Sequence, residues 1–369
     1  IVIFIVIAII STILGLYIGN TTIRLWVDKN ILKRDIGEED LPTIEIEGSN
    51  NIYACAYNNY IATVGNNTLT IYNQSAKVAT KINVVITTPK FYSNGKYLLV
   101  ADKGSSNLYL VNNETLQWQK TLEGNISQIT VNNNGAVGVV ISGTTYKSVI
   151  LMYDTSGNEL FKTYLSTTTA TDLAISEDGK YLSFAEINTS GTVLESKIKT
   201  ISVEKAKTTP TESIINTYTT DTDTIILKLK YKKTKLVAST DKGIHIYENG
   251  NDEEIVSVDN NTKFEDISLD GYVCSIEENQ TGILSTEYSL KIKNVENDKE
   301  ITYDIKSAIK SIYCYKNIIA ANTGNEVYFI NTNGWLVKKF TSLQNIKDIS
   351  IGEHTVAFIY KDSIEIMTI

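Results

Sequence analysis

The sequence predicts an all-β fold, an eight-bladed β-propeller, with an N-terminal transmembrane helix before it. A strand signature behind a Gly- or Asn-rich turn recurs along the chain, most clearly at residues 93–102, 132–140, 176–186 and 268–277. These turns recur about every 42 residues on average, which is the length of a four-stranded propeller blade. The chain has 22 Tyr and only 3 Pro, together with many β-branched residues, as half-buried strands require.

The first element, residues 1–19, is predicted to be a transmembrane anchor. Residues 1–18 carry no charge and would form about 27 Å of helix, close to the thickness of a bilayer core. We expect a further segment before it, because the chain begins with Ile rather than Met. A cleavable signal peptide is the alternative, but no small-residue cleavage motif follows the apolar run. Trp26, just beyond this run, suits the membrane interface.

A juxtamembrane stalk is predicted over residues 20–41. Taken alone, its basic residues weakly favour a cytoplasmic propeller under the positive-inside rule. That rule needs both flanks of the anchor, so the stalk does not decide the orientation. The basic residues are Arg24, Lys29, Lys33 and Arg34.

The propeller is predicted to span residues 42–369. Only three strands can be read in the last unit, so we expect the strand at residues 43–47 to pair with it and close the ring, which removes an exposed edge. Seven blades are the nearest alternative, if two weak units merge. Residues 208–223, rich in Thr, are expected to form an extended loop. The turns between first and second strands centre on Asn59, Gly95, Gly135, Gly179, Thr234, Gly271, Asn317 and His354.

The charge balance argues against a nucleic-acid partner. The formal net charge is −8, whereas phosphate binding needs clustered Lys and Arg. The dense basic run at residues 228–235 is expected to be a hairpin with solvated side chains. The chain has three cysteines, an odd number that argues against a disulfide framework, and none is spaced as in a metal-binding or redox motif. We therefore expect Cys55, Cys274 and Cys314 to be small buried thiols. We expect no metal and no cofactor.

Signs of catalysis are scarce. The chain has only 2 His, His245 in a strand-like run and His354 in a hairpin, so the commonest general base is nearly missing. A GxSxG elbow, a P-loop, a GxGxxG turn and an HExxH motif are all absent from the sequence. Asp and Glu fall mainly in turns, although carboxylates from different blades could still converge as in glycosidases. The sequence therefore favours a protein that is not an enzyme.

The loops between second and third strands are the predicted binding surface, because loops from several blades meet there. They are short, polar and rich in amides and hydroxyls, which suits a peptide or a glycan, and Tyr146 would stack on the ligand. Ordinary solvated loops are the alternative. Trp118 and Trp335 lie on predicted outer strands and are expected to pack between blades. The candidate ligand-binding residues are Asp102, Lys103, Tyr146, Asp241, Lys242 and Asn325.

Several segments resemble known repeats. NNETLQWQK and NTNGWLVKK resemble PQQ-like repeats, and SEDGKYLSFA is similar to WD40-like and TolB-like propeller hairpins. The stalk RLWVDKNILKRDIGEEDLPTIEI, the run TTYKSVILMYDTSGNELFKTYLS and the closing NTNGWLVKKF resemble a domain-of-unknown-function family from low-GC bacteria, number 5711. Its members are propellers anchored by their N-terminus behind a basic cytoplasmic leader, which implies a propeller outside the cell membrane. The resemblance implies no activity and no catalytic residue.

The sequence thus predicts a single-pass membrane protein whose extracytoplasmic propeller is a non-catalytic binding or scaffold module. Its expected partner is an envelope protein or a polysaccharide. Two alternatives stay open. One is an envelope hydrolase or lyase that uses carboxylates in the central funnel, and the other is a sensor that reports ligand binding through the anchor.

Overall fold

The structure, a computed structural model, describes residues 12, 15–17, 23, 27, 41–46, 52–280, 286–297 and 299–369. The predicted anchor at residues 1–19 and the stalk at residues 20–41, Trp26 included, fall almost entirely outside them. In the part of the chain that is described, no helix has the length and apolar character to cross a membrane.

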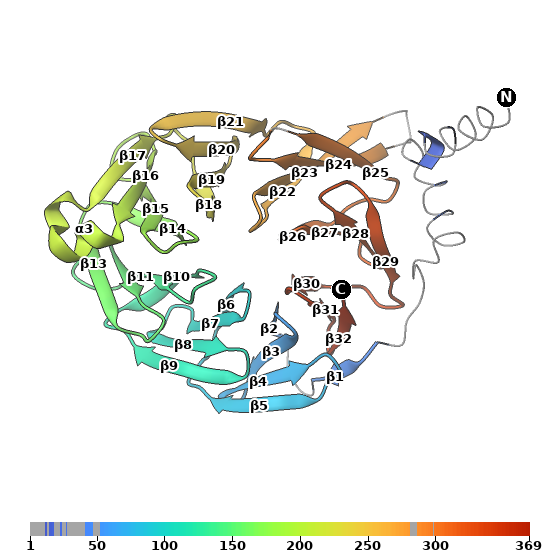
Figure 1. The fold of residues 1–369 in the computed structure, drawn as a ribbon, viewed down its shortest axis with the longest axis horizontal. Helices are drawn as coiled ribbons and strands as arrows, with labels where there is room; N and C mark the ends of the chain where they lie inside the picture. The colour runs from blue at the N-terminus through green and yellow to red at the C-terminus, as the bar shows by residue number, and fades with distance from the viewer. Residues whose placement is uncertain are drawn as a thin grey trace, which may run out of the picture. The chain divides into compact units, whose positions relative to one another are not determined.

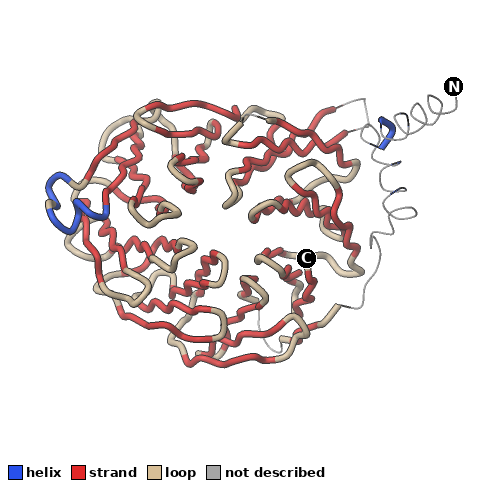
Figure 2. Tube along the Cα trace, in the orientation of Figure 1, coloured by secondary structure: helices blue, strands red, loops and turns tan. Residues whose placement is uncertain are grey.

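The described residues form eight four-stranded antiparallel sheets, which Figure 1 labels strand by strand. The fold is that of an eight-bladed β-propeller, and each sheet is one blade. The eight predicted blades are therefore confirmed, and the seven-bladed alternative is wrong. Strands dominate the described chain, as Figure 2 shows.

The larger of two compact units contains residues 41–259, 267–271 and 347–369, and it holds six of the blades. Within this unit the blades follow one another in sequence order, each with its first strand on the inner side and its fourth on the outer side (Figure 1). Blade 1 is β2 (Ala54–Tyr57), β3 (Tyr60–Gly65), β4 (Thr68–Asn73) and β5 (Val78–Asn83). Blade 2 is β6 (Pro89–Asn94), β7 (Tyr97–Asp102), β8 (Asn107–Asn112) and β9 (Thr115–Thr121). Blade 3 is β10 (Asn125–Val131), β11 (Val137–Ser142), β12 (Ser148–Tyr153) and β13 (Glu159–Leu165).

Two more blades continue this series. Blade 4 is β14 (Thr169–Ile175), β15 (Tyr181–Asn188), β16 (Glu195–Ser202) and β17 (Ile214–Thr219). Blade 5 is β18 (Ile226–Lys232), β19 (Lys235–Thr240), β20 (Gly243–Glu248) and β21 (Asn251–Ser257). The basic run at residues 228–235 forms the hairpin between β18 and β19, as predicted, but its lysines are not all solvated. Lys233 is exposed, whereas Lys228, Lys230, Lys232 and Lys235 are half-buried.

Blade 8 joins the two ends of the described chain. It consists of β30 (Asp348–Ile351), β31 (Thr355–Ile359), β32 (Ser363–Thr368) and β1 (Thr43–Glu45). β1 pairs antiparallel with β32, with Ile44 opposite Ile364. Both side chains are buried in one cluster with Ile61 of blade 1, so the N-proximal strand completes the C-terminal sheet and seals it against its neighbour.

The smaller unit contains residues 1–40, 260–266 and 272–346, and it holds two blades. Their strands pack together through a buried cluster that includes Ile292, Tyr303 and Ile330. Blade 6 is β22 (Thr262–Ile267), β23 (Tyr272–Gln280), β24 (Thr286–Asn294) and β25 (Glu300–Ile305). Blade 7 is β26 (Ser311–Tyr315), β27 (Ile318–Asn322), β28 (Glu326–Asn331) and β29 (Leu336–Thr341).

The segment at residues 208–223 differs from the extended loop that was predicted. The short helix α3 (Val203–Thr208) and the turn η1 (Pro210–Glu212) lead directly into β17, the outer strand of blade 4. The Ser202 hydroxyl caps α3 by accepting a hydrogen bond from the amide of Lys205. The Thr-rich composition masked a strand, because Thr also favours pleated, half-exposed positions.

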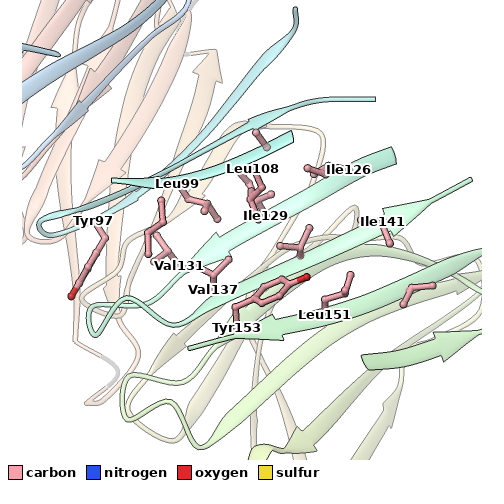
Figure 3. Close-up of a cluster of buried hydrophobic side chains, with 14 residues drawn as sticks. Tyr97, Leu99, Leu108, Ile126, Ile129, Val131, Val137, Ile141, Leu151 and Tyr153 are labelled. Carbon is pink, nitrogen blue, oxygen red and sulfur yellow. The ribbon is translucent and has the colours of Figure 1, made fainter. Parts of the chain in front are cut away.

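The core consists of apolar faces of neighbouring blades packed against each other. Figure 3 shows one such cluster between blades 2 and 3, in which Leu99, Leu108, Val137 and Leu151 are almost completely buried. Alternating side chains of each strand enter a blade interface, as a pleated sheet requires. Cys55, Cys274 and Cys314 are buried free thiols in such interfaces, as predicted.

The two tryptophans for which the sequence predicted the same position have different environments. Trp118 packs between blades, and its indole N–H donates to the Thr155 carbonyl at 3.1 Å. Trp335 is 50% exposed beside the hairpin before β29, so the prediction of interblade packing is wrong for this residue. The turn NTNG covers residues 331–334, and Trp335 follows it directly, one residue before the strand begins.

Candidate functional site

The larger unit has two ends with different connections. At the loop end, loops connect the second strand of each blade to the third, and other loops connect one blade to the next. At the turn end, tight turns join first to second strands and third to fourth strands. The loop end comprises residues 66–67, 84–88, 103–106, 122–124, 143–147, 166–168, 189–194, 220–225, 241–242 and 360–362. The turn end comprises residues 58–59, 74–77, 95–96, 113–114, 132–136, 154–158, 176–180, 203–213, 233–234, 249–250 and 352–354.

Asp102 lies at the loop end of blade 2 and is only 4% exposed. Its Oδ1 atom accepts hydrogen bonds from the amides of Thr87 and Thr88, at 2.9 and 2.8 Å. These two residues belong to the connection that enters the blade. The carboxylate therefore holds that connection against the end of β7, which is a structural task, while the neighbouring Lys103 side chain is exposed.

The same arrangement recurs in blade 5. The Asp241 carboxylate accepts a hydrogen bond from the amide of Ile225 at 2.7 Å. Lys242 donates from Nζ to the carbonyl of Thr222 at 2.9 Å. In blade 4, Glu186 lies two residues before the end of β15 and binds Lys199 Nζ at 2.7 Å and the hydroxyl of Thr168 at 2.8 Å. An acid near the end of the second strand thus contacts the entering connection in three blades.

Tyr146 has a different environment. It lies in the loop of blade 3 and is 37% exposed, and its ring contacts the ring of Tyr164 with centroids 4.6 Å apart. Tyr164, near the end of β13, is 53% exposed. The next loop along, in blade 4, exposes Val193, and its Ser190 hydroxyl accepts a bond from Lys147 Nζ at 3.5 Å. We call Tyr146 and Tyr164 the tyrosine pair.

Asn325, the sixth candidate residue, lies in blade 7 of the smaller unit. Its side chain is exposed, and its backbone carbonyl accepts a hydrogen bond from the amide of Ser342 at 2.7 Å. The six candidates therefore lie in four blades. Their described hydrogen bonds and ring contacts stay within each residue's own blade or the connections that enter and leave it.

A row of polar residues along the inner strands was missed by the sequence reasoning. Lys90 of β6 donates from Nζ to the Ser127 carbonyl at 2.9 Å and also contacts Gln128 of β10. Gln128 in turn donates to the Thr171 carbonyl of β14 at 2.7 Å. Asp172, next in β14, accepts a hydrogen bond from the amide of Leu229 of β18 at 2.8 Å. We call Lys90, Gln128, Thr171 and Asp172 the inner row, which links four blades.

The inner row contains a perturbed acid. Burial raises the pKa of Asp172 to about 6, although the amides of Leu229 and Leu173 and the charges of Lys90 and Lys228 act to lower it. Burial also lowers the pKa of Lys90. Acids were expected mainly in turns, whereas Asp172 lies in the middle of a strand. In the sequence, Asp172 is one acid among small and apolar residues, in the run ATDLAIS. This pattern alone is a weak signal of a perturbed acid.

A metal site has no candidate among the residues that the structure describes. No group of three or more His, Cys, Asp or Glu side chains lies together there in a way that could hold a metal ion.

Solved structures that resemble this chain include a WD40 domain. The C-terminal WD40 domain of Sif2 shares 13% identity, with 91% of this chain and 99% of that chain covered at a TM-score of 0.59. Sqt1 from Chaetomium thermophilum shares 10% identity, with 90% and 100% covered at a TM-score of 0.59. Identities this low show the fold alone.

No curated protein matches the chain. A family model does match, over residues 38–369, and its description reads "Family of unknown function (DUF5711)". This match covers the whole propeller and includes two of the three segments whose resemblance was noted in the sequence, residues 144–166 and 331–340, but only residues 38–46 of the third, the stalk segment at residues 24–46. The chain therefore belongs to the DUF5711 family.

Proposed function

We propose that this protein is a non-catalytic binding or scaffold module, held at the outer face of the cell membrane by its N-terminal segment. Its propeller contacts envelope polysaccharide, or an envelope protein, through the loop end. The likeness to WD40 domains supports a binding role, since that architecture presents loops from many blades to one partner.

The tyrosine pair carries this proposal. Exposed tyrosine rings give a partner large, rigid and partly apolar surface at small entropic cost. Tyr146 and Tyr164 contact each other, so they form one surface rather than two isolated rings. The hydroxyls of Thr144 and Ser190 and the ammonium group of Lys147 lie in the same two loops. Such a mixture suits the faces and hydroxyls of a sugar chain.

A binding experiment tests this proposal. The full chain in detergent is incubated with insoluble wall polysaccharide from a low-GC bacterium, and the bound fraction is measured by sedimentation. We expect the double variant Tyr146→Ala, Tyr164→Ala to bind about thirtyfold more weakly, because stacking contributes on the order of 1 kcal/mol for each of the two rings. Trp335→Ala is the matched control, since it removes an exposed ring from another blade. Equal binding by the parent chain, the double variant and Trp335→Ala would show that the tyrosine pair does not bind the polysaccharide.

Orientation is tested separately. The native thiols are buried, so an exposed new cysteine gives a clean signal. Asn325→Cys should react with a membrane-impermeant maleimide in intact cells if the propeller lies outside. Labelling only after lysis would place the propeller in the cytoplasm and would contradict the proposed location.

A hydrolase or lyase is the second candidate function, and the inner row favours it. An acid with a pKa near 6 beside lysines can exchange protons at neutral pH. Release of reducing ends from the same polysaccharide, if it occurs and is abolished by Asp172→Asn, would establish this candidate. Release that persists in Asp172→Asn would come from another group.

A further inference from the structure

A small cavity opens at the turn end of the larger unit, between blades 4 and 5. Its volume is about 150 Å³, below the roughly 300 Å³ at which pockets for drug-sized ligands begin. Four tyrosines line it, Tyr181, Tyr218, Tyr231 and Tyr247. A cavity of this size suits one small group rather than a whole ligand.

The local fold explains why the cavity exists. Thr200 of β16 faces Asn216 of β17, but the next pair joins Ile201 to Ile214, so Ile215 is bulged out of register. Thr200, Ile215 and Asn216 all line the cavity. The insertion formed by α3 and η1 replaces a tight hairpin just before this bulge. Bulges of this kind turn side chains away from the regular pleat and often border binding sites.

Two phenols of the cavity differ in their hydrogen bonds. Tyr231 Oη lies 2.6 Å from Ser183 Oγ, which lies 2.7 Å from Thr200 Oγ1, so this hydroxyl is fully engaged. Tyr247 is only 2% exposed, and its hydroxyl makes no hydrogen bond of good geometry, although the Asp252 carboxylate lies near enough to interact with it. A buried hydroxyl without a partner is unfavourable by about 1–3 kcal/mol. A ligand group in the cavity would satisfy it.

The charges around the cavity favour a cation. Glu248 is the one carboxylate of the lining, and the lining residues, all within the described range 52–280, include no Lys or Arg. Burial raises the pKa of Tyr247, and the charges of Asp252 and Asp221 raise it further, so the surroundings are negative. Aromatic rings also attract cations through their faces. Tyr218 and Tyr247, with centroids 4.8 Å apart, bring two rings together at this place.

We propose that this cavity binds an alkylammonium group, which comes either from a free amine or from a lysine side chain of a partner protein. The ammonium hydrogens donate to the Tyr247 hydroxyl oxygen and to the Glu248 carboxylate. The alkyl chain packs on the tyrosine rings. This site lies at the turn end, so it is independent of the tyrosine pair and of the function proposed for it.

Calorimetric titration of the full chain in detergent tests the site. The probes are n-butylammonium, the peptide acetyl-Ala-Lys-Ala-amide and the neutral isostere n-butanol. We expect butylammonium to bind, n-butanol not to bind, and added salt to weaken binding because the interaction is partly ionic. Binding of the peptide alone would identify a partner's lysine as the source, and binding of butylammonium alone would identify a free amine. Equal affinity for butylammonium and n-butanol, or no binding by either cation, would refute the proposal.

Two variants separate recognition from folding. Tyr247→Phe keeps the ring and removes a hydroxyl that makes no hydrogen bond of good geometry, so it should change the melting temperature little, yet it should weaken butylammonium binding about tenfold. Glu248→Gln should weaken it about as much, since a charged acceptor is replaced by a neutral one. Tyr153→Phe, which removes the hydroxyl of another buried tyrosine in blade 3, is the matched control and should bind normally. Unchanged affinity in both cavity variants would contradict the assignment.

Discussion

The two ends of the larger unit differ in how their polar and apolar groups are used. At the turn end, asparagines join neighbouring blades: Asn132 Nδ2 donates to the Ser176 carbonyl at 3.1 Å, and Asn134 Nδ2 donates to the Glu177 carbonyl at 2.9 Å. At the loop end, backbone groups are satisfied by acids such as Asp102, while Val85 and Tyr146 stay exposed. Asparagine side chains thus join neighbouring blades at the turn end, whereas the loop end exposes apolar and aromatic side chains.

The largest effect that would test this difference comes from two glycines. Gly135 at the turn end and Gly104 at the loop end both have positive φ, +82° and +79°. A Cβ at Gly135 would lie 2.7 Å from the Tyr97 ring, whereas a Cβ at Gly104 would meet nothing within 4 Å. We expect Gly135→Ala to destabilise the fold by about 3 kcal/mol, from backbone strain and overlap together. Gly104→Ala should lose only about 1 kcal/mol, from strain alone.

Urea unfolding of the two alanine variants measures this difference directly. Equal losses at the two glycines would mean that the turn end is no more tightly packed than the loop end. The two ends would then differ only in their hydrogen bonds and in their exposed side chains.

Asp102 gives the next largest effect. In Asp102→Ala the amides of Thr87 and Thr88 lose their acceptor in a buried place, which we expect to destabilise the fold by about 2 kcal/mol. Asp102→Asn keeps an acceptor oxygen and should recover about half of this loss. Lys103→Ala, at the exposed neighbouring position, is the control and should change stability by less than about 0.5 kcal/mol. Thermal unfolding monitored by circular dichroism gives the ranking, and a Lys103 effect as large as that of Asp102 would contradict it.

The repeats could be predicted because turn chemistry is local. Gly95, Gly135, Gly179 and Gly271 all have positive φ in the structure, and only Gly adopts this conformation freely, so the turns were visible as Gly in the sequence. The strand at residues 43–47 was also predictable, since three strands at the C-terminus leave one edge unpaired. The described strand is shorter and covers Thr43–Glu45.

The candidate site was less accessible to sequence reasoning, for a physical reason. Asp102 and Asp241 have the polar loop context of ligand-binding residues, but the amides that they accept from belong to connections 14 to 16 residues earlier in the chain. The cavity needs tyrosines from two blades and a bulge, and the raised pKa of Asp172 comes from its burial in the folded chain. Such tertiary environments leave no periodic signal. The six loop candidates remain predictions.

The smallest effect concerns pH and compares Asp172 of the inner row with Asp154 at the turn end. The pKa of Asp172 is raised from 3.8 to about 6 in the folded state. Between pH 3.8 and about pH 6, Asp172 therefore takes up a proton when the chain folds. Its contribution to stability is complete below pH 3.8 and is lost as the pH rises through about 6. Asp172→Asn should therefore gain about 1 kcal/mol relative to the parent chain between pH 4 and pH 7, after allowance for partial exposure to solvent.

Asp154 should behave in the opposite way. Burial acts to raise its pKa, but hydrogen bonds from Asn158, Ser156 and Gly157 outweigh it, and the pKa is lowered below 3.8. Its contribution is therefore present at neutral pH and is lost as the pH falls through the lowered pKa. Asp154→Asn should be less stable than the parent chain at pH 7, and this deficit should vanish in acid. Urea midpoints measured from pH 3 to pH 7.5 separate the two signs. If both variants responded to pH in the same direction, the inner row and the turn end would not hold their acids in electrostatically different environments.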